Sequence, residues 1–319
     1  MTTPAYRGRF APSPTGPLHF GSLVAALASC LEARAQGGEW YLRMEDVDAP
    51  RCSPSTADDI LRTLERFGFA WDGPVLWQSR RREAYGQALA LLITRGAVFP
   101  CACTRRELAD SRFSEIAADG AAIYPGTCRQ GLPPGKSARS WRLRVGEARI
   151  TFADALLGCI SSELAREVGD FVLRRADGVF AYQLAVVVDD ADCGMTHVLR
   201  GADLLHSTAR QIFLQQCLGL PTPAYAHVPV AVNAAGEKLS KQTGALPLDA
   251  AHPGHDLVAA LRFLGQMPPP DLALESVATI WAWACAHWSL TAVPRSLTRP
   301  YNDCAISTQD TANESAQRD

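Results

Sequence analysis

The sequence lacks any long apolar run, and it lacks a strong excess of charge of either sign. No stretch approaches the roughly 18 apolar residues that a membrane-spanning helix needs, and the first residues contain no apolar segment of the kind found in secretory signal peptides. We therefore expect a cytoplasmic protein with no membrane partner. The formal net charge of −2 does not indicate a nucleic-acid-binding protein, so any such contact must depend on local basic segments.

Two common nucleotide-binding motifs are absent as well. Neither the G-x-G-x-x-G fingerprint nor the Walker A pattern occurs, which disfavours an ordinary dinucleotide or P-loop site. Hydrophobic residues make up 47% of the 319 residues and charged residues 20%, so there is enough apolar material for a sizeable core. A chain of this length predicts about two domains, or one large domain with an insertion.

The N-terminal part alternates between short strand-like and longer helix-like segments. A strand is expected within 7–14, a helix at 23–36, a second strand at 40–44 and a second helix at 55–67. This order is typical of a parallel sheet with helices on its faces. We therefore predict an α/β fold with a doubly wound parallel, Rossmann-like sheet.

A similar alternation returns later in the chain. The continuously apolar run Tyr182–Val188 predicts a buried parallel strand. Asp189 and Asp190 would then lie at its C-terminal end, where open α/β sheets bind their ligands. A helix is expected at 207–218 and another strand near 228–232.

Between these two parts the texture of the sequence changes. Cysteine, glycine, proline and arginine become frequent and the periodicity weakens, which indicates an inserted subdomain. The predicted units are the first half of a catalytic domain at 1–99, the insertion at 100–180, the second half at 181–245, a stem-like helical region at 246–295 and a disordered tail at 296–319.

The segment from Pro12 to Ser22 is the first of two segments that suit a phosphate-containing ligand. It lies between a predicted strand and a predicted helix, so backbone N–H groups and the helix dipole point at whatever binds there. Gly16 and Gly21 let a purine and phosphates approach the backbone closely, and His19 adds a hydrogen-bond donor. Taken alone, His19 is more often a packing residue at a helix N-terminus.

The second segment is Lys238–Gln242, in a polar loop that begins with a glycine. Two lysines three residues apart suit a leaving pyrophosphate, because phosphoryl chemistry depends on positioning and charge neutralisation. Taken alone, such a pair is usually solvated charge. Because both segments occur in one chain, they predict an ATP site with His19, Lys238 and Lys241 as catalytic residues.

Both segments resemble the signature motifs of class I aminoacyl-tRNA synthetases. His19–Ser22 is similar to their HIGH sequence, with Phe and Ser in place of Ile and the final His. Lys238–Gln242 is similar to KMSKS, with Leu and Gln in place of Met and the final Ser. The segments 9–16, 43–48 and 199–203 resemble the glutamyl branch. This resemblance covers most of the chain and implies a class I catalytic domain with an insertion and a short C-terminal helical region.

The resemblance also implies binding roles for particular residues. An ATP molecule, arriving with Mg²⁺, would contact Thr15, Gly16, His19, Gly21 and Lys241. L-glutamate would contact Arg9, Ser13, Glu45, Tyr182 and Arg200. The arginines would face a substrate carboxylate, because a planar guanidinium matches its geometry, and Glu45 would face the amino group. Without the motifs, Arg9 and Glu45 would be interpreted as an ordinary ion pair at strand ends.

Three of the ten cysteines are close together in the insertion. Cys101, Cys103 and Cys128 offer three thiolates to a tetrahedral zinc ion, which would stabilise a segment that lacks a core of its own. No histidine lies nearby to supply a fourth ligand. Short members of the resembled family use a tyrosine, and Tyr124 matches that pattern, so the resemblance implies one structural zinc ion per chain. The alternative for Tyr124 is a packed aromatic side chain.

Length distinguishes members of the glutamyl branch. Full glutamyl-tRNA synthetases carry a further helical region that reads the anticodon, whereas this sequence leaves room for one or two helices after its catalytic part. It therefore resembles the shorter glutamyl-queuosine tRNA(Asp) synthetases, which activate glutamate as its adenylate and esterify the queuosine base in the anticodon of tRNA(Asp). The implied partners of this expected monomer are ATP, L-glutamate and queuosine-containing tRNA(Asp).

Three alternatives remain open. A short glutamyl-tRNA synthetase would charge the acceptor end of tRNA, and a non-catalytic paralogue would only bind glutamate or tRNA. Another nucleotidyltransferase of the same fold would join an acid to a small amine. The intact His19 and the two lysines disfavour the non-catalytic protein, and the segments 43–48 and 199–203 disfavour the nucleotidyltransferase.

RNA contact is expected from the insertion, where basic residues are frequent and Glu147 is the only acidic residue weighed against them. Clustered arginine and lysine side chains attract the phosphate backbone. The alternative is an ordinary solvated surface. The residues concerned are Arg129, Lys136, Arg139, Arg142, Arg144 and Arg149.

Overall fold

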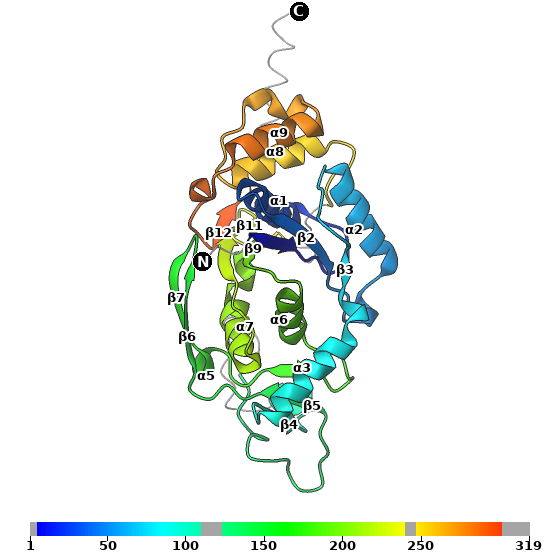
Figure 1. Cartoon of the computed structure of the whole chain (residues 1–319), viewed down its shortest axis with the longest axis vertical. Coiled ribbons are helices and arrows are strands. Elements are labelled where there is room, and N and C mark those ends of the chain that lie inside the picture. The colour runs from blue at the N-terminus through cyan, green and yellow to red at the C-terminus, as the bar shows by residue number, and fades with distance from the viewer. Residues whose placement is uncertain (1–4, 110–122, 240–246, 302–319) are drawn as a thin grey trace, which may run out of the picture.

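The computed structural model describes residues 5–109, 123–239 and 247–301, and its N-terminal part is a parallel sheet with helices packed on it (Figure 1). β1 and β2 pair in parallel with Arg7 opposite Glu39, and β2 pairs in parallel with β3. The predicted order of strand, helix, strand and helix is confirmed. The elements are β1 (Arg7–Phe10), α1 (Phe20–Ala35), β2 (Glu39–Met44), η1 (Ala49–Arg51), α2 (Pro54–Arg66), β3 (Leu76–Trp77), η2 (Gln78–Arg80) and α3 (Arg82–Thr94).

A second sheet lies beside β1. β10 lies between β9 and β6 and runs parallel to both, while β7 pairs antiparallel with β6. The N–H of Thr196, just before β9, donates to the carbonyl of Arg7 over 3.1 Å, which joins this sheet to β1. The elements are β6 (Arg149–Asp154), β7 (Gly158–Glu163), β9 (His197–Gly201), η3 (Ala202–Leu204), α7 (Leu205–Leu218) and β10 (Ala224–Val228).

The segment predicted as a buried strand at Tyr182–Val188 is instead the start of a helix, α6 (Tyr182–Asp192). A continuous apolar run suits a fully buried strand or a fully buried helix, because both hide every side chain. α6 packs against α3, α7 and the strand β8 (Val172–Arg174), and its residues from Leu184 to Asp190 are buried. Asp190 therefore lies in the C-terminal part of a helix and not at the end of a strand.

The expected insertion is divided between two sheets. β5 lies between β4 and β8 in a small antiparallel sheet at the lower end of Figure 1. Its Leu143 and Leu173 of β8 share one apolar core with α3, α6 and α7. β6 and β7 belong instead to the sheet of β9 and β10. The further elements here are β4 (Val98–Cys101), α4 (Arg105–Ala109), β5 (Ser140–Leu143) and α5 (Leu164–Glu167).

The C-terminal helices pack against α1 at the other end of the molecule (Figure 1). Phe263 of α8 meets Phe20 of α1 edge to face, with ring centroids 5.7 Å apart. β12, within the range predicted as a disordered tail, pairs in parallel with β11. No helix of the described ranges has the length and apolar character needed to cross a membrane. The elements are β11 (Val230–Val232), α8 (Pro253–Phe263), η5 (Pro270–Leu274), α9 (Val277–His287), η6 (Leu290–Ala292) and β12 (Thr298–Pro300).

Candidate active site

A cavity of about 590 Å³ opens where the C-terminal ends of β1 and β9 meet the N-terminus of α1. It is lined by segments from both halves of the sequence, and local sequence patterns do not predict that these segments meet. Lys241 lies outside the described residues. The predicted site residues that line the cavity are Arg9, Ser13, Thr15, Gly16, His19, Gly21, Glu45, Tyr182, Arg200 and Lys238.

The N-terminus of α1 forms one wall of the cavity. His19 occupies the N-cap position, and its carbonyl accepts from the N–H groups of Ser22 and Leu23 over 2.9 and 3.1 Å. A helix start provides no backbone acceptor for the N–H groups of Phe20 and Gly21. A Cβ on Gly21 would lie 3.2 Å from Cε1 of His19, so the glycine leaves room for the imidazole over the first turn. The positive end of the helix dipole and these amides suit the negative charge of a phosphate.

Lys238 reaches the cavity from a hairpin that follows β11. The N–H of Leu239 donates to the carbonyl of Ala231 over 2.8 Å, which closes the hairpin. Nζ of Lys238 lies 2.6 Å from Oδ2 of Asp203 in η3. The lysine side chain is 47% exposed, so this pair is an ammonium at the rim of the cavity and not a buried ion pair.

Arg9 and Glu45 belong to a buried network of four charged side chains. Arg9 donates to Asp190 through Nε over 3.1 Å and Nη2 over 3.2 Å. Arg43 donates to Asp190 through Nη1 and to Glu45 through Nη2. The network links β1, β2 and α6, and it leaves the Nη1 side of Arg9 for a substrate.

Burial and charge act differently on the two carboxylates of this network. Burial by itself raises the pKa of Asp190, but the adjacent Arg43 and Arg9 guanidinium groups hold that pKa well below its ordinary value. Burial raises the pKa of Glu45, and Arg43 and Arg9 offset that only in part. Asp190 is therefore a permanent negative charge, whereas a further cation in the cavity would stabilise the ionised form of Glu45.

Arg200 enters the cavity from β9, with its side chain held on one side by protein acceptors. Nε donates to Nε2 of His227 over 3.2 Å, and Nη2 donates to Oγ1 of Thr208 over 2.8 Å and to the carbonyl of Leu204 over 3.4 Å. Its Nη1 is buried and has no hydrogen-bond partner among the described residues. The N–H groups left for a ligand are therefore those of Nη1.

A fully buried acid and imidazole lie behind Arg200. Nδ1 of His227 is 2.6 Å from Oδ2 of Asp154, and neither side chain is exposed. Burial lowers the pKa of His227 below its ordinary value, although Asp154 opposes that effect. Burial raises the pKa of Asp154, but its hydrogen bond with His227 and the backbone N–H groups of Leu157 and Leu156 bring it below the ordinary value.

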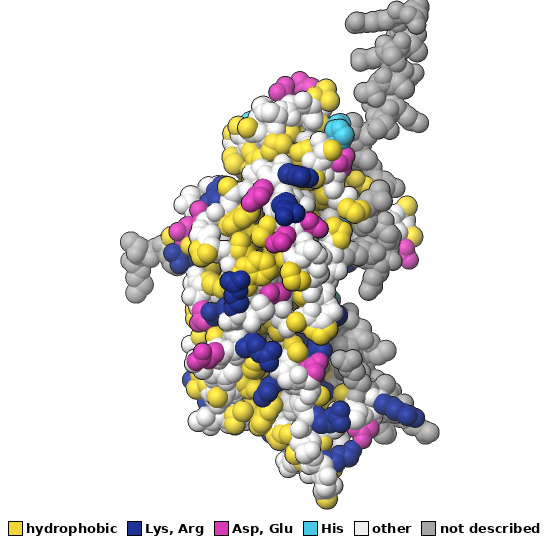
Figure 2. Space-filling model, turned by 90° about the vertical axis from the view of Figure 1, so that its right-hand side faces the viewer, with side chains coloured by type: hydrophobic (Ala, Val, Ile, Leu, Met, Phe, Trp, Pro, Cys, Tyr) yellow, Lys and Arg dark blue, Asp and Glu magenta, His cyan; other side chains and the backbone are white. Residues whose placement is uncertain are grey.

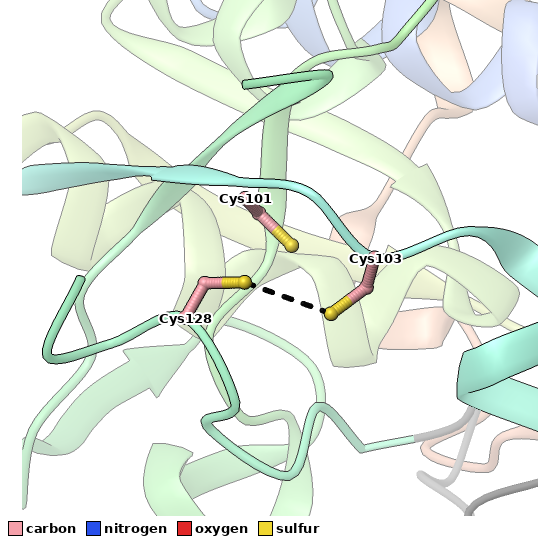
Figure 3. A group of neighbouring side chains, drawn as sticks. All are labelled: Cys101, Cys103 and Cys128. Carbon is pink, nitrogen blue, oxygen red and sulfur yellow. Dashed lines mark hydrogen bonds between the residues drawn. The ribbon is translucent and has the colours of Figure 1, made fainter. Parts of the chain in front are cut away.

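The three predicted cysteine ligands do converge, and Figure 3 shows their sulfur atoms pointing at one another. The Sγ atoms of Cys103 and Cys128 are 3.7 Å apart, and Oη of Tyr124 lies 3.5 Å from Sγ of Cys101 and 3.7 Å from Sγ of Cys103. A tetrahedron with Zn–S bonds of about 2.3 Å and a Zn–O bond of about 2.0 Å needs sulfur–sulfur distances of roughly 3.8 Å and oxygen–sulfur distances of roughly 3.5 Å. The four atoms fit such an ion.

Neighbouring donors favour negative charge on Cys101, whereas burial raises the pKa of Cys103 to about 11 and also raises the pKa of Tyr124. Burial alone raises the pKa of Cys101, but hydrogen bonding with Tyr124 and Arg142 outweighs it and brings the pKa to about 7. The guanidinium of Arg142 donates to Sγ of Cys101 over 3.4 Å and lies over the Tyr124 ring, 4.0 Å from its centroid. The N–H of Cys128 donates to Oη of Tyr124 over 2.7 Å. A metal needs deprotonated ligands of this kind.

The expectation that Arg142 contacts RNA is wrong, because its side chain is buried beside the cysteine cluster. The insertion also contains more acidic partners for its basic side chains than the single Glu147 considered in the sequence. Arg129 pairs with Asp170 and Lys136 with Glu107, and Arg149 pairs with Glu163. Figure 2 still shows Lys and Arg side chains gathered in the lower half of one face.

Sequence comparisons show the family of the chain. Residues 5–262 match the family of class I tRNA synthetases (E and Q), catalytic domain. A glutamyl-Q tRNA(Asp) synthetase of Aromatoleum aromaticum is 63% identical over 294 residues, covering 92% of each chain. One of Dechloromonas aromatica is 62% identical over 295 residues, covering 92% of this chain and 97% of the other. The chain belongs to the glutamyl-Q tRNA(Asp) synthetase family.

Two solved structures of longer relatives resemble this family member in fold. The glutamate-tRNA synthetase of Elizabethkingia anophelis has a TM-score of 0.76 at 25% identity, over 96% of this chain and 68% of that one. A glutamate tRNA ligase of Elizabethkingia meningosepticum, in complex with its amino acid, has a TM-score of 0.75 at 25% identity, over 93% and 67%. The class I fold is thereby confirmed, and as a family member the protein is a ligase.

Several residues behind the cavity of this glutamyl-Q tRNA(Asp) synthetase family member are not predicted by the sequence. The sequence pattern predicts Asp190 at the C-terminal end of a strand, and it gives Arg43 no role of its own within the segment 43–48. His227 and Asp154 carry no local signal, since nothing in the sequence of either strand indicates that the two side chains meet. A buried histidine beside a buried aspartate becomes visible only once β10 pairs with β6.

Proposed function

We propose that this member of the family activates L-glutamate with ATP and transfers the glutamyl group to the queuosine base of tRNA(Asp). In the first step an oxygen of the α-carboxylate attacks the α-phosphorus of ATP, glutamyl-adenylate forms and pyrophosphate leaves. In the second step a hydroxyl of the queuosine diol loses its proton and attacks the activated carbonyl, an ester forms and AMP leaves. The names of the similar proteins support this acceptor.

The observation that carries the proposal is that Arg200, Glu45 and His19 line one cavity. Glutamate has two carboxylates and one ammonium. Its site therefore needs a cation for the side-chain carboxylate, an anion for the ammonium and a place where the α-carboxylate meets the α-phosphate of ATP. In our proposal Nη1 of Arg200 binds the side-chain carboxylate and Glu45 binds the ammonium, which favours the ionised form of Glu45. The α-carboxylate then faces His19 and the N-terminus of α1, where the α-phosphate of ATP lies.

The remaining site residues complete this arrangement. Ser13 supports the ammonium end of glutamate, and the hydroxyl of Tyr182 and the Nη1 side of Arg9 add donors to the same pocket. Thr15, Gly16 and Gly21 contact ATP, which brings its own Mg²⁺. Lys238 and Lys241 neutralise the pyrophosphate as it leaves. The role of Lys241 rests on its motif alone.

We propose that Cys101, Cys103, Cys128 and Tyr124 hold one structural zinc ion. The distances between these ligand atoms and the donors beside the thiolate of Cys101 support the ion. Zinc would cross-link β4 to the segment that contains Tyr124 and Cys128, and it would take no part in the reaction. Cys103 and Cys128 line a different cavity from the one that holds His19.

We also propose that the protein acts as a cytoplasmic monomer, with catalytic halves at 1–99 and 181–245, an insertion at 100–180 and a helical region at 246–295. Size-exclusion chromatography with light scattering measures the assembly, and a dimer mass would contradict this part.

The proposed function is tested with radiolabelled glutamate, ATP and purified protein. The acceptors are tRNA(Asp) with queuosine, tRNA(Asp) without it and tRNA(Glu), and His19→Ala is the inactive control. We expect label only on queuosine-containing tRNA(Asp), and we expect it to survive removal of the terminal adenosine. Label on tRNA(Glu) that is lost with that adenosine would identify a short glutamyl-tRNA synthetase instead. No glutamate-dependent pyrophosphate exchange would exclude the adenylate chemistry altogether.

A further inference from the structure

Arg200 lines the cavity, and the groups behind it leave one of its nitrogens without a protein partner among the described residues. A guanidinium has five N–H donors. Nε donates one to His227, and Nη2 donates to Thr208 and to the carbonyl of Leu204. The two donors of Nη1 are left, and that nitrogen is buried without a protein partner among the described residues. An acidic ligand is therefore met end-on by Nη1 and not by the fork of Nε and Nη2.

The contacts on both sides of His227 require the same form of its ring. Nε of Arg200 can only donate, so Nε2 of His227 is the acceptor and carries no proton. Nδ1 lies 2.6 Å from a carboxylate oxygen of Asp154, so Nδ1 carries the ring proton and donates it there. The opposite tautomer would direct an N–H at the N–H of Arg200, two donors facing one another.

We propose that Asp154 and His227 are positioning residues for substrate selection: they hold Arg200 so that only its Nη1 reaches the side-chain carboxylate of the amino acid. This inference rests on the proposed binding of glutamate by Arg200. Asp154 acts by fixing the tautomer of His227, as an acid fixes the imidazole of a hydrolytic triad. Neither residue lines the cavity, so neither touches substrate.

Thr208 is the second support of the guanidinium. Its Oγ1 accepts from Nη2 of Arg200 over 2.8 Å and lies 3.0 Å from Nε2 of His227. Thr208 sits on α7, whereas Asp154 is on β6 and His227 on β10. Three separate elements therefore determine the orientation of one side chain, which explains how a buried arginine keeps a defined free edge.

The first test is Asp154→Asn. The Oδ1 of Asp154 accepts the N–H groups of Leu156 and Leu157 over 3.0 and 2.9 Å, and an asparagine oxygen preserves that turn. The new amide N–H₂ instead faces Nδ1 of His227, which favours the Nε2–H tautomer and turns a donor towards Arg200. We expect the KM for glutamate in pyrophosphate exchange to rise about 10- to 100-fold. The KM for ATP should stay unchanged.

A second pair of variants keeps the test independent of any folding defect in the first. Thr208→Val removes the hydroxyl at nearly constant volume, and Thr208→Ser retains it. We expect a raised KM for glutamate in the valine variant and a KM near wild type in the serine variant. Tyr225→Phe is the matched control, because it removes the buried hydrogen bond from Gln215 without changing a donor of this array.

A spectroscopic measurement separates this inference from the proposed function. ¹⁵N shifts of the histidine rings report which nitrogen is protonated. We expect an Nδ1–H tautomer for His227 in the wild type and an Nε2–H tautomer in Asp154→Asn, whatever the enzyme's substrate is. An Nε2–H tautomer in the wild type would overturn the inference. So would an unchanged glutamate KM in both Asp154→Asn and Thr208→Val. Absence of glutamate-dependent exchange in the wild type would refute the proposed function and this use of Arg200 together.

Discussion

Asp190 in α6 accepts two hydrogen bonds from Arg9 in β1, over 3.1 and 3.2 Å, and both side chains are only 5% exposed. The same carboxylate also binds Arg43 of β2. One aspartate therefore ties a helix of the second half of the sequence to two strands of the first. The pair also sets which side of Arg9 remains for the cavity.

Asp190→Asn should destabilise the fold strongly, because it leaves Arg9 and Arg43 buried with less opposing charge. Removing one partner of a buried ion pair costs about 3–5 kcal/mol. Asp192→Asn is the control, since that residue pairs with Arg81 at 51% exposure, and pairs so exposed contribute about 0–1 kcal/mol. Urea unfolding of both variants measures the difference. Equal losses of free energy would contradict the role of Asp190.

Substitution of the loop lysines should slow adenylate formation without unfolding the protein. We expect Lys241→Ala and Lys238→Ala each to lower the rate of pyrophosphate exchange roughly 10²- to 10³-fold, because each removes a charge that meets the leaving group. Lys136→Ala is the control, as that lysine pairs with Glu107 away from the cavity. Unchanged exchange in Lys241→Ala would remove the loop from the mechanism. Circular dichroism checks that the fold is intact.

Removal of the cysteine ligands should release one zinc ion per chain. Cys101→Ser combined with Cys103→Ser leaves too few thiolates to hold the ion, and we expect the part around β4 and β5 to become more accessible to proteases. Cys159→Ser is the control, because Cys159 is exposed and lies outside the cluster. Elemental analysis gives the metal content. Wild-type protein purified without zinc would contradict the site.

The KM for glutamate should depend on pH through His227. The groups that face this ring are Asp154 from β6, Arg200 from β9 and Asp203 from η3, and burial leaves its pKa below 6.5. The ring is therefore neutral above pH 6.5, and the KM should be constant there. It should rise as the pH falls further and protonation puts an N–H against Arg200.

The stability of the fold should also decrease at low pH. His227 has a lower pKa in the folded protein than in the unfolded chain, so the unfolded chain binds the proton more tightly. The free energy of unfolding therefore falls as the pH drops from 6.5 towards the pKa of His227 in the folded protein. His197→Gln is the control for the kinetic profile, since that histidine also has a lowered pKa but contacts Tyr6 and Thr196, whereas His227 contacts Arg200. A glutamate KM that is flat to well below pH 6.5 in both proteins would exclude this coupling.

The residues that we propose to contact the ligands could be picked out from sequence because each lies in a short segment with its own geometry. His19 is the N-cap of α1, Gly21 lies in the first turn of that helix, and Lys238 follows a glycine turn, so local rules place them. The cysteines were found for the same reason, as thiols two residues apart can share a metal. Their fourth partner, Tyr124, needed the resemblance to a family.

What the sequence by itself determined is therefore the chemical inventory of the site: an anion-binding helix start, a lysine loop, two arginines and a thiol cluster. Only the tertiary structure decided how these groups are held. It made Tyr182–Asp192 a helix, because burial on several sides erases the periodicity that separates helix from strand. It also joined Asp190 to Arg9 and Asp154 to His227, since such pairs depend on which distant elements pack together and on the exclusion of water between them.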